Sequence, residues 1–170
     1  MYKISRLQIY FILALGLLLH LTVLDRIMIF GAKPDLMLIP VIFFGFFLGR
    51  NAGLESGFVA GLSKDLFALD IFGINTLIFA ITGFLAGLLG AQFSRESKRT
   101  QFLVVMLLTA FSMMLHFAIV SVLSKRIYLD IGEYFTASVI PACVYTGLVS
   151  IPVFIKLMDL YRLRGSEDYL

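Results

Sequence analysis

The residues best suited to chemistry in this chain are two histidines and one adjacent pair of opposite charges. His20 and His116 each lie within an apolar run, and Lys64 is followed directly by Asp65. Two histidines could bind a metal ion or relay protons. Neither histidine, however, has a second ligand three or four residues away, and the sequence contains no H-E-x-x-H. The pattern therefore favours hydrogen bonds between helices over a metal or proton-relay site.

Sequence motifs of common enzymes are absent. The nearest match to a phosphate-binding loop, GLSKD at 61–65, lacks the second glycine, and no G-x-S-x-G nucleophile turn occurs. A single cysteine, Cys143, excludes an internal disulfide and a thiolate metal cluster. The sequence therefore predicts a protein that is not an enzyme and has no catalytic residue, cofactor or metal.

The composition indicates the environment in which the histidines and the charged pair lie. Of 170 residues, 60% are hydrophobic and 15% are charged, with a mean hydropathy of +0.97. Soluble domains have about 45–50% apolar and about 25% charged residues. A soluble globule of this size could not bury so much apolar surface, so water-soluble enzymes and nucleic-acid-binding modules are excluded. In a membrane protein the net charge of +3 reports orientation and contact with anionic lipid.

Apolar runs separated by charged or turn-forming residues predict a single all-α membrane domain with six spans. Pro34-Asp35 opens the second span, because proline is tolerated at a helix start and Asp35 can accept hydrogen bonds from the free amides there. Pro141 and Pro152 are expected to kink the sixth. The predicted spans are about 7–24, 36–49, 54–69, 74–93, 102–123 and 134–158.

Basic residues in short loops predict the orientation. With an uncleaved N-terminal anchor and six spans, nine of the 14 Lys and Arg residues fall on the side of the N-terminus and five on the other. This bias predicts that both termini are cytoplasmic. The third segment is short and carries two charges, but a re-entrant segment there would leave five spans and move the basic loop at 94–101 to the outside. The nine are Lys3, Arg6, Arg50, Arg95, Lys98, Arg99, Lys156, Arg162 and Arg164, and the five are Arg26, Lys33, Lys64, Lys125 and Arg126.

The strongest pattern is a series of glycines spaced by four. A spacing of four places residues on one helix face, where two backbones can approach closely because no side chains intervene. Such a face serves either packing within the bundle or a groove for the helix of a partner, and both can hold on different helices. The series is Gly45, Gly49, Gly53, Gly57 and Gly61, repeated on the fourth helix by Gly83, Gly87 and Ala91.

Asp65 continues the series four residues after Gly61 and so points along the small-residue face. An ionisable residue at membrane depth is costly unless it is paired, solvated or close to the interface. Two interpretations remain open from the sequence. Asp65 and Lys64 either make specific contacts between helices or with a partner, or lie solvated in the outer headgroup layer.

The order of these features resembles the MreD family of small, multi-span membrane proteins in the bacterial rod-shape system. The resemblance covers essentially the whole chain. The residues that carry it are Pro34-Asp35-Leu36, the stretch from Gly53-Leu54 to Gly61-Leu62-Ser63-Lys64-Asp65-Leu66, then Gly73, and Gly83-Phe84-Leu85-Ala86-Gly87.

The resemblance implies a scaffold of the bacterial inner membrane that acts in lateral peptidoglycan synthesis and cell shape. It implies as partners a bitopic MreC-like protein, an MreB-like filament and the RodA/penicillin-binding-protein synthase pair. It also implies a six-helix arrangement similar to the S components of energy-coupling-factor vitamin transporters. The residues expected at a packing or partner interface are Pro34, Asp35, Gly53, Gly57, Gly61, Asp65, Gly83 and Gly87.

The alternative from another class is a solute-binding S component of such a vitamin transporter. This alternative accounts for the bundle and for the kinked sixth helix, since broken helices line substrate sites in transporters. S components commonly carry an A-x-x-x-A element in the first helix, whereas here Ala14 is followed four residues later by Leu18. An intramembrane enzyme using His20 or His116 is a more distant third.

Overall fold

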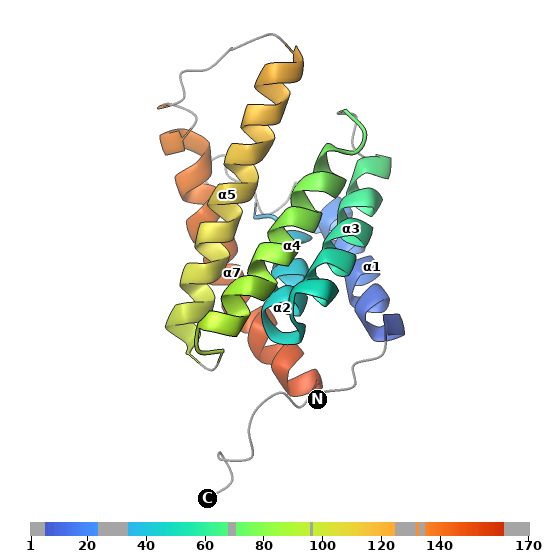
Figure 1. Cartoon of the computed structure of the whole chain (residues 1–170), viewed down its shortest axis with the longest axis vertical. Helices are drawn as coiled ribbons and strands as arrows, with labels where there is room; N and C mark the ends of the chain where they lie inside the picture. Colours follow the sequence, from blue (N-terminus) through green and yellow to red (C-terminus); the bar gives the residue numbers. More distant parts are fainter. Residues whose placement is uncertain are drawn as a thin grey trace, which may run out of the picture.

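The computed structural model describes residues 6–23, 34–67, 71–95, 97–124, 132 and 135–161. This part of the chain is all-helical, as predicted, with six helices and a short π-helical turn, η1. In Figure 1, α3 and α4 lie side by side, and α5 lies next to α7. The elements are α1 (Arg6–Val23), α2 (Leu38–Leu48), α3 (Arg50–Phe67), α4 (Ile74–Gln92), α5 (Lys98–Ser124), η1 (Phe135–Val139) and α7 (Ile140–Leu160).

Helix α2 is the centre of the bundle. Every residue from Leu38 to Phe46 is buried, and α2 contacts each of the other five helices. A helix that is apolar on all sides must be covered on all sides, and LIPVIFFGFFL is such a sequence. Its Phe43 ring meets Phe154 of α7 edge-on at a centroid distance of 5.2 Å, which joins the central helix to α7.

Three helices are long and apolar enough to cross a membrane: α4, α5 (over Lys98–Leu123) and α7. Helices α1 (Arg6–Thr22) and α2 are apolar but shorter. Helix α3 has 18 residues but carries Arg50, Glu55, Lys64 and Asp65, so its composition is mixed. The described residues thus give six helices, of which three meet the criteria for a span by length and composition alone.

Two helices start earlier than hydropathy predicts. Helix α3 begins at Arg50 rather than near 54, and α5 begins at Lys98 rather than near 102. The added first turns are polar, so the apolar pattern marks the buried or lipid-facing part of each helix and misses its water-facing turn. At α5, Ser97 stands before the helix and its hydroxyl oxygen accepts a hydrogen bond from the Thr100 amide at 3.4 Å.

The last helix changes type next to Pro141. Helix α7 begins at Ile140, so Pro141 lies in its first turn, directly after a π-helical turn. The preceding residues form η1. Pro152 does lie inside the helix.

Basic residues gather at one end of the bundle. Of the seven Lys and Arg residues in the described part of the chain, six lie at or near helix ends that share the lower side of Figure 1. We call this the basic end. Lys64 is the exception and lies near the opposite end of α3. The six residues of the basic end are Arg6, Arg50, Arg95, Lys98, Arg99 and Lys156.

Candidate functional site: a glycine-packed helix face and two carboxylates

The α3 face that contacts α4 consists of Gly53, Gly57 and Gly61. A Cβ atom added at any of these glycines would overlap the backbone of α4. Since no side chain fits, the two helices approach backbone to backbone, the arrangement that small residues at intervals of four permit. The three overlaps involve the carbonyl groups of Gly83, Phe79 and Asn75, respectively.

Helix α4 contributes a matching face, but its third member differs from the prediction. Gly83 lies against the Gly53 carbonyl and Gly87 against the backbone of Arg50. The third small residue on this face is Gly90, which meets the Phe46 carbonyl of α2, whereas the predicted Ala91 is exposed. With 3.6 residues per turn, the seventh residue returns closer to the starting face than the eighth does.

Gly49 was predicted to belong to the packing series, and this prediction is wrong. A Cβ atom at Gly49 would meet nothing within 4 Å. The residue instead has φ +100° in the turn between α2 and α3, a conformation that glycine adopts without steric cost. Gly49 therefore reverses the chain direction, and it is Gly45 that packs on α4, against Gly83 and Ala86.

Asp65 lies at the opposite end of this face and is 4% exposed. Its Oδ1 accepts hydrogen bonds from the Asn75 amide at 3.1 Å and the Asn75 side chain at 2.9 Å. Its Oδ2 accepts them from the Thr76 amide at 2.9 Å and the Thr76 hydroxyl at 2.5 Å. The first amides of a helix have no partner within it and carry its positive dipole end. An acidic side chain of α3 therefore caps α4.

Asp35 lies just before α2 and gathers groups from three other helices. Lys64 of α3 places its Nζ 2.8 Å from the Asp35 Oδ2, and Nδ1 of His20 in α1 is 4.0 Å from Oδ1. The Asp35 amide donates to the Thr146 hydroxyl of α7 at 3.2 Å. As predicted, Oδ1 also accepts hydrogen bonds from amides at the start of α2, those of Met37 and Leu38, both at 3.2 Å.

The two carboxylates have different tasks. Asp65 binds α4 to α3, while Asp35, preceded by the buried Pro34, joins the start of α2 to α1, α3 and α7. Both make contacts between helices, one of the two interpretations that the sequence leaves open for Asp65. The described residues contain no group of three or more His, Cys, Asp or Glu that could hold a metal ion.

Comparison with known proteins identifies the family. A family model described as rod shape-determining protein MreD matches residues 1–164. The chain belongs to the MreD family. No match was found among curated proteins or among solved structures. The resemblance inferred from Pro34-Asp35-Leu36 and the Gly53–Leu66 stretch is therefore confirmed at the level of family. Membership of the MreD family implies a rod shape-determining membrane protein.

Within this MreD-family chain, Arg95 has a structural task at the basic end. Its Nε donates to the Gly90 carbonyl at 2.8 Å and its Nη1 to the Phe47 carbonyl at 3.1 Å. These carbonyls lie in the last turns of α4 and α2, where helices leave acceptors unsatisfied. Gln101 donates in turn to the Arg95 carbonyl at 2.7 Å. Hydropathy gives no sign of these contacts, because the partners are backbone groups.

Loss of the ion pair between Lys64 and Asp35 should lower the stability of the protein by a moderate amount. Both side chains are about a quarter exposed, at 22% and 24%. Exposed pairs contribute about 0–1 kcal/mol and broken buried pairs cost about 3–5 kcal/mol. Lys64→Met should therefore lower the free energy of unfolding by about 1–2 kcal/mol, measured by denaturant titration of the protein in detergent micelles.

A matched control tests whether this loss comes from the pair. Arg6 pairs with Glu55 at 3.7 Å, but the Arg6 side chain is 79% exposed. Arg6→Met also replaces a cation by a thioether and should change stability by less than about 0.5 kcal/mol. Equal losses in the two variants would show that Asp35 gains nothing from Lys64.

Proposed function

We propose that this protein is a non-enzymatic scaffold of the rod-shape complex in the bacterial inner membrane. In this proposal it binds an MreC-like bitopic partner and, through it, works with an MreB-like filament and a RodA/penicillin-binding-protein synthase in lateral peptidoglycan synthesis. The observation that carries the proposal is the MreD family match over residues 1–164.

The proposal includes six spans with cytoplasmic termini. All six helices would cross or enter the membrane, with the shorter α1, α2 and α3 supported by the bundle around them. The gathering of six of seven described cations at the basic end supports a cytoplasmic position of that end. Similarity of the arrangement to S components of vitamin transporters stays a prediction from the family resemblance.

The packing of the bundle bears on how a partner helix would bind. The glycine faces of α3 and α4 are filled by each other and by α2, so a partner helix would bind to an outer face. Outer faces are apolar: α1 exposes Leu7, Phe11 and Leu18, each by more than half. The task of the glycine packing and of Pro34, Asp35 and Asp65 would then be to fix the shape of the surface that the partner meets.

Detergent pull-down with the tagged full chain, combined with depletion in a rod-shaped host, tests the function. We expect recovery of an MreC-like protein and rounding of the cells. No recovery of such a protein, together with rods of normal width after depletion, would overturn the proposal. A co-purifying vitamin whose uptake is lost on depletion would favour the S-component alternative instead.

A further inference from the structure

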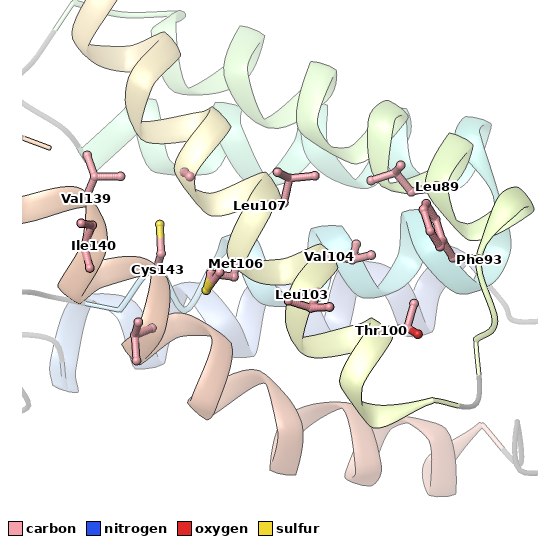
Figure 2. Close-up of a pocket in the computed structure, with 12 residues that line it drawn as sticks. Leu89, Phe93, Thr100, Leu103, Val104, Met106, Leu107, Val139, Ile140 and Cys143 are labelled. Atoms are coloured by element: carbon pink, nitrogen blue, oxygen red, sulfur yellow. The ribbon is translucent and has the colours of Figure 1, made fainter.

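An apolar groove runs along the outside of the bundle between α4, α5 and α7. It has a volume of about 490 Å³ and is lined by twelve residues. Figure 2 shows Phe93 and Thr100 at one end and Val139, Ile140 and Cys143 at the other. Several lining side chains are more than 40% exposed, so the groove is open along its side: Phe93, Leu103, Leu107, Ile140 and Val144.

The groove has the depth of one membrane leaflet. Along α5 it extends from Thr100 to Ala110, which is about 15 Å at 1.5 Å per residue. The hydrocarbon core of a bilayer is about 30 Å thick, so one leaflet contributes half of that. The length of the groove therefore matches an acyl chain of one leaflet.

The volume of the groove points to the same kind of occupant. The groove has a volume of about 490 Å³ and is open along one side, so it takes in a slender apolar group along its length. Its lining is apolar except for the Thr100 hydroxyl and the Cys143 thiol. A single hydrocarbon chain matches this length, volume and lining.

Positive charge stands at one end of the groove only. Lys98 and Arg99 begin α5 directly before Thr100, and both are exposed. Arg99 precedes Leu103 by four and Met106 by seven residues, so it lies on the helix face that lines the groove. This is the basic end, at the headgroup level of the leaflet that the groove spans, and a basic residue near that surface attracts anionic lipid.

We infer that this groove binds one acyl chain of an anionic phospholipid of the cytoplasmic leaflet. The phosphate group of this lipid contacts Arg99 and Lys98. The inference rests on the proposed orientation of the basic end but not on any protein partner. The lipid fills the opening between α4 and the α5–α7 pair, so it stabilises the angle between these two parts of the bundle.

Native mass spectrometry of the purified full chain tests this inference. The protein is incubated with phosphatidylglycerol or with phosphatidylcholine of the same acyl chains, and retained lipid is counted per chain. We expect one retained phosphatidylglycerol, preferred over phosphatidylcholine by about fivefold. Ala110→Phe and Val144→Phe fill the groove from α5 and α7 and should reduce the retention of both lipids about tenfold.

Arg99→Gln tests the recognition of the lipid headgroup separately from the binding of the acyl chain. This variant should retain phosphatidylcholine as the unmodified protein does, but lose its preference for phosphatidylglycerol. Two controls make the same chemical changes elsewhere. Ala118→Phe lies on an exposed part of α5 beyond the groove, and Arg50→Gln removes an exposed cation at the start of α3. Both should leave lipid retention and preference unchanged.

Several results would overturn the inference. One is unchanged phosphatidylglycerol retention in a monodisperse Ala110→Phe or Val144→Phe protein; another is a preference that survives Arg99→Gln. Equal loss in the Ala118→Phe control would show that retention does not report this groove. Loss of a second copy or of a bound partner helix in Ala110→Phe, with lipid retention intact, would assign the groove to that occupant instead.

Discussion

Gly57→Ala should lower the free energy of unfolding by about 3 kcal/mol or more. The added methyl group would overlap the Phe79 carbonyl and the Ala80 Cα of α4. Neither is the end of a flexible side chain that could turn away, so one helix backbone has to shift. In lipid, helices gain little from hydrophobic association and depend on such close packing. Gly57→Leu, which is larger still, should prevent α3 and α4 from packing together.

Gly16→Ala provides the matched control. Gly16 also lies within a helix, α1, but a Cβ atom there would meet its nearest neighbours, Met37 Sδ and Pro40 Cγ, at 3.7 Å, an ordinary contact. Glycine inside a helix is about 0.5–1 kcal/mol less favourable than alanine, so Gly16→Ala should leave stability unchanged or raise it. Unfolding in detergent, followed by circular dichroism, measures both variants. Equal effects at the two positions would contradict the close packing of α3 on α4.

The glycine pattern shows how far the sequence predicts this site. Spacing by four predicts the face formed by Gly53, Gly57 and Gly61, since these residues lie in one continuous helix. It does not predict that Gly49 turns the chain, because spacing carries no information about φ. It also prefers Ala91 over Gly90, because strict steps of four drift around a helix with 3.6 residues per turn.

Contacts between distant residues are the other part that the sequence does not predict. Asp35 and Lys64 are 29 residues apart, and no periodic pattern relates them. The cap that Asp65 provides for α4 is also not visible, since capping residues normally stand directly before their own helix. In α4 that position is Gly73, which has no side chain to offer. The prediction that Asp65 points along the small-residue face was the only sequence signal for this contact.

Replacement of Asp65 is the second change with a large expected effect. Asp65→Leu removes four hydrogen bonds to a charged acceptor and leaves the buried Asn75 donors and the partly buried Thr76 donors without that partner. Hydrogen bonds to charged groups contribute about 1.5–3 kcal/mol each, and contributions within one network do not add fully. We therefore expect a loss of about 3–5 kcal/mol, together with weaker recovery of the MreC-like partner in the pull-down.

Asp65→Asn tests the cap separately from the size of the side chain. One carboxylate oxygen becomes an NH₂ group, which has no acceptor to offer to either the two Asn75 donors or the two Thr76 donors. We expect a loss of about 2–3 kcal/mol. The control is Asp159→Asn, the same change at an exposed position of α7, where contacts of a solvated carboxylate contribute at most about 1 kcal/mol.

A double-mutant cycle with Thr76→Val then decides whether the bond between the two helices is the cause. If the Asp65 carboxylate acts through the start of α4, Asp65→Asn should cost less in a Thr76→Val background, because one of its four donors is already gone. The coupling should reach about 1 kcal/mol, as for groups in one hydrogen-bond network. Additive losses would mean that the bond from the Thr76 hydroxyl contributes nothing, which would leave the cap of α4 to the two backbone amides and the Asn75 side chain.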